Sequence, residues 1–116
     1  MAIITNGIKE GHKIEGIGDD FIPDIVDLEL LDDVVLIDDK DAINMADKIA
    51  KELGLGVGIS SGANMMASIL INNNYNVVTV FPDDNKKYIS TELSSNPYKN
   101  QNLISNQIEL LSYEIL

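Results

Sequence analysis

A glycine- and serine-rich phrase between two apolar segments constrains this chain more than any other feature. Residues 58–64 read Gly-Ile-Ser-Ser-Gly-Ala-Asn, directly behind the apolar run 55–59, and the nearly uncharged stretch 63–71 follows. This order predicts a buried strand, a tight turn and a buried helix. Such a turn presents backbone N–H groups and the hydroxyls of Ser60 and Ser61 where a cofactor or an anion can bind. Judged from the pattern alone, serines at such a place are most often helix caps.

Further periodic segments extend this turn into a parallel α/β unit. Residues 34–37 and 77–81 are short β-branched runs that predict two more strands. Between strands, helical spacing of apolar residues predicts one helix over 42–53 and the buried helix over 63–71. Strands and helices that alternate with short connections build a parallel sheet. We therefore expect an α/β fold, with a parallel sheet flanked by helices.

The ends of these elements carry their own signals. Asp39 or Asp41 is the expected cap of the helix over 42–53, and Gly54 is the expected stop. Ligands of parallel sheets bind beyond the carboxyl ends of the strands. The turns at 60–61 and 82–85 follow two predicted strands, so we expect them to be spatial neighbours.

The carboxyl-terminal segment has a helical pattern. Ile104, Ile108, Leu111 and Ile115 follow one another at spacings of four, three and four residues. The pattern predicts an amphipathic helix, whose apolar stripe requires a partner surface.

Composition limits the classes of function. The 116 residues, 45% of them apolar, suit one soluble domain over 1–116, and neither a membrane span nor a secretory signal is present, so we expect a cytoplasmic protein. The net charge of −11 and the lack of arginine argue against nucleic-acid binding.

Two other site types fit the sequence poorly. Acidic residues follow 34–37, as in receiver domains of response regulators, but Ser60 stands where such a domain needs another strand-end acid. Residues 83–85 resemble the start of a calcium loop but lack its glycine. Because His12 is the single histidine and cysteine is absent, we expect no metal site.

Three phrases together resemble cysteine synthase, also called O-acetylserine sulfhydrylase. They are His-Lys-Ile-Glu-Gly-Ile-Gly with Phe-Ile-Pro over 12–23, Gly-Ile-Ser-Ser-Gly-Ala over 58–63, and Pro82 with Lys-Tyr-Ile-Ser-Thr over 87–91. The resemblance covers about residues 5–93 and corresponds to the carboxyl-terminal third of that family's chain. Residues 94–116 are not matched.

The resemblance implies a partial domain of the type II pyridoxal-phosphate enzyme fold, that of the tryptophan synthase β chain. The implied reaction, in cysteine biosynthesis, is β-replacement, in which acetate leaves the amino-acid substrate O-acetylserine and sulfide adds. Ser60 aligns with the serine whose hydroxyl hydrogen-bonds the pyridine nitrogen of pyridoxal phosphate, and Gly16, Ile17 and Gly18 align with a loop that lines the cofactor and substrate cleft. A neutral hydroxyl keeps the ring less protonated than a carboxylate would.

Two departures from the family pattern bear on activity. Asp19 and Asp20 stand where cysteine synthases carry small residues, and an acid there is also seen in cystathionine β-synthases, which leaves the substrate open. None of the eight lysines lies in the context of the lysine that holds the cofactor covalently, and the phosphate loop is also missing. We therefore expect no catalytic residue in this chain, no covalent pyridoxal phosphate and no activity of the chain alone.

Two interpretations follow. In the first, the chain is a carboxyl-terminal piece, a truncated gene product or one half of a split enzyme, and it pairs with the amino-terminal portion of the enzyme or with itself. In the second, it is a non-catalytic remnant that acts as a binding or assembly module. A part of a cystathionine β-synthase-like enzyme is a further alternative.

Overall fold

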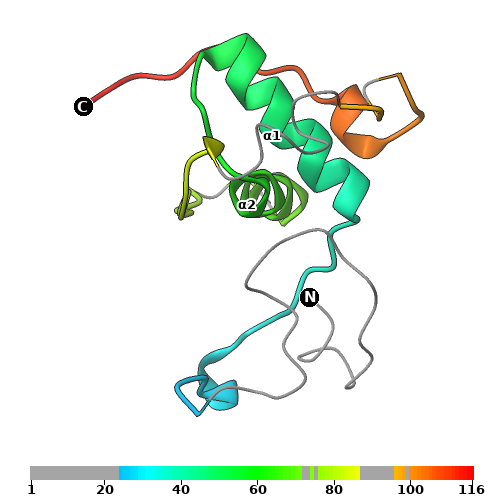
Figure 1. Ribbon diagram of the computed structural model, residues 1–116. Coiled ribbons are helices and arrows are strands. Elements are labelled where there is room, and N and C mark those ends of the chain that lie inside the picture. Colours follow the sequence, from blue (N-terminus) through cyan, green and yellow to red (C-terminus); the bar gives the residue numbers. More distant parts are fainter. Residues whose placement is uncertain (1–23, 72–73, 75, 87–95, 99) are drawn as a thin grey trace. The chain divides into compact units, whose positions relative to one another are not determined.

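The computed structural model describes residues 24–71, 74, 76–86, 96–98 and 100–116. The chain divides into two units, residues 1–36 and 37–116. The described part of the first unit holds the 3-10 helix η1 (Leu28–Leu30), which Asp27 caps by accepting a hydrogen bond from the Glu29 N–H at 3.0 Å (Figure 1). No helix in the described ranges has the length and apolar character to cross a membrane.

Helix α1 (Asp39–Leu53) confirms the helix predicted over 42–53. Its cap is Asp38 and not Asp39 or Asp41, because Asp38 keeps an extended backbone, from which its carboxylate accepts a hydrogen bond from the Lys40 N–H at 2.8 Å. At the other end Gly54 adopts a left-handed conformation with φ of 72°, as its predicted role as a stop requires.

Helix α2 (Ile59–Leu70) begins four residues before the predicted helix over 63–71. The N–H groups of Ser61 and Gly62 both donate to the Gly58 carbonyl, at 3.1 and 3.2 Å, so helical bonding already starts within the glycine- and serine-rich phrase. Gly58 is the cap and uses no side-chain bond. The interpretation of Ser60 and Ser61 as helix caps is therefore wrong, because both lie in the first turn.

The two α-helices cross steeply: Figure 1 shows α2 nearly end-on while α1 runs across the view. Gly62 of α2 lies at the crossing, where a Cβ would overlap the Ala42 carbonyl oxygen and lie 2.8 Å from the Ala46 nitrogen. The core around the crossing includes the fully buried Ile43, Met45 and Ile49 of α1.

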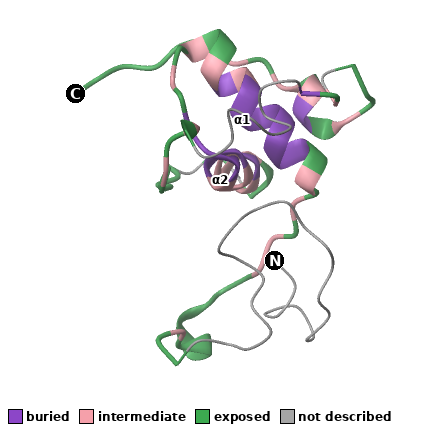
Figure 2. Ribbon diagram, in the orientation of Figure 1, coloured by how far each residue is buried: buried purple, intermediate pink, exposed green. Residues whose placement is uncertain are grey.

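Helix α1 is buried on more than the single apolar stripe that its sequence predicts. Residues 41–47 are buried without interruption, and Figure 2 shows this as a continuous band along α1. Asp41, Asn44 and Asp47 belong to the band although they are polar. Polar partners must therefore cover the second face of this helix.

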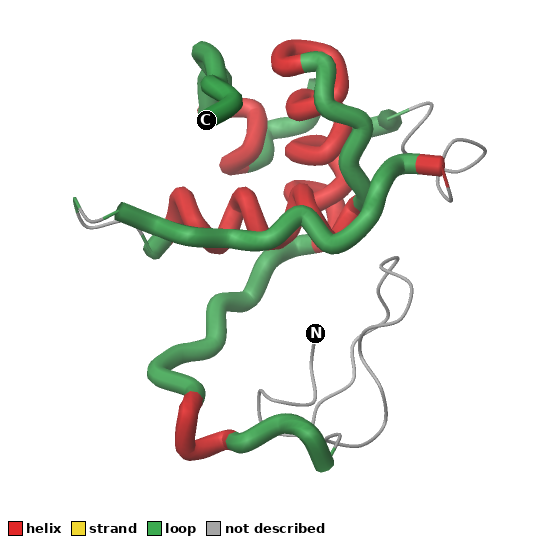
Figure 3. Tube along the Cα trace, turned by 90° about the vertical axis from the view of Figure 1, so that its left-hand side faces the viewer, coloured by secondary structure: helices red, strands yellow, loops and turns green. Residues whose placement is uncertain are grey.

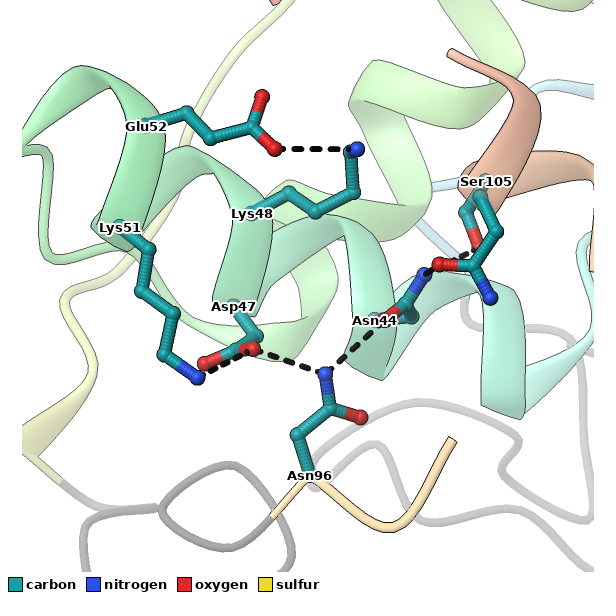
Figure 4. Close-up of polar contacts among 8 residues, drawn as sticks. Asn44, Asp47, Lys48, Lys51, Glu52, Asn96 and Ser105 are labelled. Carbon is teal, nitrogen blue, oxygen red and sulfur yellow. Dashed lines mark hydrogen bonds and ion pairs between the residues drawn. The ribbon is translucent and has the colours of Figure 1, made fainter. Parts of the chain in front are cut away.

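Those partners come from residues 96–106 (Figure 4). The Asn44 amide donates to Ser105 Oγ at 2.9 Å and to Asn106 Oδ1 at 2.7 Å. The Asn96 amide donates to Asn44 Oδ1 at 2.9 Å and to Asp47 Oδ2 at 2.8 Å. We call these five residues the asparagine network. It satisfies the buried Asn44 amide and Asp47 carboxylate of α1 and fastens the carboxyl-terminal segment to that helix.

The predicted amphipathic helix at the carboxyl terminus is wrong. Residues Ile104–Gln107 form only the 3-10 helix η3, and residues 108–116 continue without helix. Leu111 and Ile115 of the predicted apolar stripe are 81% and 90% exposed. The Ser105 N–H donates to Asp41 Oδ1 at 2.7 Å, which fastens the start of this segment to α1.

The predicted parallel sheet is not found among the described residues, which form helices and loops (Figure 3). Residues 34–37, 55–59 and 77–81 make no strand there, and the bridge between Val57 and Asp84 is isolated and antiparallel. Strands need a neighbour for their backbone groups, and Val78 and Val80 of the third segment are 94% and 65% exposed.

Candidate functional site

The start of α2 packs against the turn at 82–85, which confirms that these two turns are spatial neighbours. The Gly58 N–H donates to the Asp83 carbonyl at 3.0 Å, and the Asn85 N–H donates to the Gly56 carbonyl at 3.2 Å. Two backbone hydrogen bonds of opposite direction therefore clamp residues 56–58 to residues 83–85. We call this arrangement the glycine clamp.

Two glycines allow the clamp to close. A Cβ on Gly58 would overlap the carboxyl group of Asp83, with Cγ at 2.6 Å and Oδ2 at 2.7 Å. A Cβ on Gly56 would lie 3.0 Å from Asn85 Oδ1. The Asp83 carboxylate thus occupies the space beside the cap of α2, where the positive end of the helix dipole favours a negative charge.

The two serines of the phrase have different environments. Ser61 is completely buried, and its hydroxyl donates to the Asp83 carbonyl at a long 3.4 Å. Ser60 is half-buried, and no hydrogen bond joins its hydroxyl to another described residue. Ser61 therefore packs the turn against the clamp, whereas Ser60 offers a hydroxyl that can meet a ligand.

The other predicted site residues cannot be compared with the structure. Gly16, Ile17 and Gly18 lie outside the described residues, as do Asp19, Asp20 and the residues 87–91 of the third phrase. Of the predicted site, the structure thus describes Ser60 and its surroundings. Within the described ranges no group of three or more acidic or histidine side chains is placed to hold a metal ion.

The described site can hold a group and orient it. A neutral hydroxyl at a helix start can exchange a hydrogen bond with a ring nitrogen, and the nearby Asp83 carboxylate disfavours a second anion at the same helix end. The arrangement therefore suits a neutral polar group of a ligand better than a phosphate.

Sequence reasoning missed the clamp. The sequence predicted that the turns at 60–61 and 82–85 are neighbours but not the paired backbone bonds, although the alternation of Gly56, Val57 and Gly58 was a usable signal. Glycines on either side of one apolar residue indicate a close approach of another backbone segment.

No family model matches the chain. Among curated proteins it is 44% identical over 101 residues to the cysteine synthase of Buchnera aphidicola subsp. Schizaphis graminum, a match that covers 82% of this chain and 31% of the relative. It is 36% identical over 96 residues to the O-acetylserine dependent cystathionine beta-synthase of Bacillus subtilis, covering 79% of this chain and 31% of the relative.

The comparison with solved structures gives the same result as the comparison with curated proteins. The hydrogen sulfide-producing enzyme of Fusobacterium nucleatum is 54% identical and superposes with a TM-score of 0.72 over 80% of this chain and 29% of that enzyme. The chain thus spans about a third of the length of the proteins it matches.

The fold and sequence place the chain among enzymes named for cysteine and sulfide chemistry. More narrowly, it belongs to the cysteine synthase family, as a segment about a third as long as the family's enzymes.

Proposed function

We propose that this chain is the carboxyl-terminal segment of a pyridoxal-phosphate-dependent cysteine synthase, which replaces the acetate of O-acetylserine with sulfide. In this proposal Ser60 hydrogen-bonds the pyridine nitrogen of the cofactor. One observation carries it: Ser60 is half-buried and its hydroxyl has no hydrogen bond to another described residue, while Ser61 is completely buried.

The site around Ser60 fits the pyridine nitrogen of the cofactor. When bound, pyridoxal phosphate supplies an electron sink for bonds at the amino-acid carbon. The chain's own contribution is to hold the ring with a neutral group, because Ser60 can accept or donate a hydrogen bond without adding charge. Gly16, Ile17 and Gly18 are proposed to line the same cleft.

We further propose that the 116 residues alone are inactive and need a partner. The segment at 77–81 is largely apolar and exposed, and the Asn64 amide donates a hydrogen bond to its Val80 carbonyl at 2.8 Å. The amino-terminal portion of the enzyme is the proposed cover for this segment, and self-association is the alternative.

A second candidate reaction is release of sulfide from an amino acid. The Fusobacterium relative, named for hydrogen sulfide production, is 54% identical, compared with 44% for the Buchnera cysteine synthase. Asp19 and Asp20 also depart from the small residues usual in cysteine synthases. Sulfide release from cysteine, measured beside cysteine formation from O-acetylserine and sulfide, separates the two reactions.

A chimera tests the proposal. The matching segment of the Buchnera enzyme is replaced by this chain, and cofactor binding and both reactions are measured. We expect a folded enzyme that retains pyridoxal phosphate, and we expect Ser60→Ala to shift its absorption while Ser61→Ala leaves it in place. A chimera that folds but binds no cofactor would favour the alternative of a non-catalytic binding or assembly module.

A further inference from the structure

The glycine clamp controls the position of the first turn of α2. Gly58 sits at its centre, because the Gly58 N–H is held by the Asp83 carbonyl at 3.0 Å while the Gly58 carbonyl accepts the first two hydrogen bonds of α2. Ser60 lies between the cap and the two donors, Ser61 and Gly62. Any movement of Gly58 therefore displaces the Ser60 backbone.

The Asp83 side chain adds a second constraint on the same residue. Its carboxyl group fills the space that a side chain at position 58 would take. A carboxylate there attracts the N–H groups at the start of α2. Asp83 thus holds Gly58 through its carbonyl, and its carboxyl group packs against Gly58 beside the helix start.

We propose that Asp83 is a positioning residue for Ser60. Its carboxylate fixes the first turn of α2 so that the Ser60 hydroxyl points consistently toward its ligand. The part of this inference that concerns the cofactor rests on the proposed function of Ser60, whereas the part that concerns the helix start does not.

The helix start is tested on the full chain without cofactor, by amide hydrogen exchange at Ser61 and Gly62. We expect Asp83→Ala to speed exchange at both amides by about two- to fivefold, the range that a carboxylate at a helix N-terminus contributes. Asp84→Ala is the matched control, because it removes the neighbouring carboxylate, which is half-exposed and pairs with Lys86. Equal exchange in the Asp83→Ala variant and the unchanged chain would overturn the proposal.

Gly58→Ala provides a second variant that keeps the charge. Its Cβ would displace the Asp83 carboxyl group, so we expect exchange at Ser61 and Gly62 to rise as in Asp83→Ala. Circular dichroism of the α1 and α2 helices checks that both variants remain folded. A folded Gly58→Ala variant with unchanged exchange would also contradict the proposal.

The link to Ser60 is tested by a double-mutant cycle in the cofactor-loaded chimera. We expect Asp83→Ala to shift the cofactor absorption in the same direction as Ser60→Ala, and to add no further shift in the Ser60→Ala background. Additive shifts would show that Asp83 acts on the cofactor by another route and would overturn the positioning role. If Ser60→Ala itself causes no shift, the proposed function of Ser60 fails, and the exchange data still decide whether Asp83 fixes the helix start.

Discussion

Gly62 of α2 lies so close to Ala42 of α1 that a single added carbon on Gly62 would overlap the Ala42 carbonyl oxygen. The contact is between backbones, which cannot move aside as a flexible side chain can. Because the start of α2 also carries Ser60, this crossing ties the candidate site to the core of the second unit.

The crossing predicts that Gly62→Ala destabilises the chain although alanine is the better helix former. We expect a loss of about 1–3 kcal/mol in the free energy of unfolding, as for other overpacked core positions. Thermal and urea unfolding measure it. Unchanged or raised stability would mean that the two helices do not approach each other as described.

Gly54→Ala provides a contrast, because nothing lies within 4 Å of a Cβ at that position. The Gly54→Ala substitution lowers the free energy of unfolding through the backbone alone, since φ is 72° and an L-residue with a side chain is strained there. We expect about 1–2 kcal/mol of destabilisation. In the Gly54→Ala variant, amide exchange should change at the end of α1 and remain unchanged at Gly62. A change at both places would argue that the Gly54→Ala and Gly62→Ala effects do not have separate causes.

The asparagine network predicts a strong effect of Asn44→Ala. The substitution removes three hydrogen bonds and leaves partners on Asn96, Ser105 and Asn106 unsatisfied. A buried polar group without a partner costs about 1–3 kcal/mol. Urea unfolding and amide exchange at Ser105 measure the loss, with the exposed Asn102→Ala as the control. Equal stability of the two variants would show that the network contributes little.

Lys51→Ala should have a small effect by comparison. Lys51 pairs with Asp47 at 2.8 Å, but its side chain is 59% exposed, and the two residues are four apart on α1. Such pairs contribute about 0.3–0.5 kcal/mol and are screened by salt. The difference in unfolding free energy between Lys51→Ala and the unchanged chain should shrink at high ionic strength, and a large salt-independent loss would contradict this account.

Local signals predicted α1 and α2 well and the remainder poorly. The apolar spacing over 42–53 and Gly54 predicted α1 almost to its ends, because capping and periodicity act within a few residues. The asparagine network joins residues more than fifty positions apart, such as Asn44 and Ser105, and no local pattern encodes such a pairing. The apolar spacing of residues 104–115 is equally local, and it did not produce a helix beyond η3.

Some features of the candidate site could be predicted from the sequence, and others could not. The proximity of the turns at 60–61 and 82–85 followed from the order of the elements. The choice of Ser60 rests on the resemblance to cysteine synthase and stays a prediction. The role of Asp83 did not, because it depends on the fit of one carboxyl group against a glycine of another segment. The predicted sheet needs strand partners, and the described residues supply only the bridge between Val57 and Asp84.

The exposed segment at 77–81 leads to the last prediction, that the chain on its own associates through it. Val78 and Val80 are 94% and 65% exposed, and removal of apolar surface from water contributes about 25 cal/mol per Å² before the costs of association. We expect oligomers in sedimentation equilibrium at micromolar concentration and a shift toward monomer in the Val78→Lys variant, because a buried lysine charge opposes the contact.

A charge control separates the contact from electrostatics. The chain has a net charge of −11, so any added lysine reduces repulsion between copies and by itself favours association. Asn102→Lys adds the same charge at an exposed position outside the segment. We expect it to associate at least as strongly as the unchanged chain. If Val78→Lys and Asn102→Lys sediment alike, or if the unchanged chain is a monomer, the segment at 77–81 is not the surface through which the chain associates.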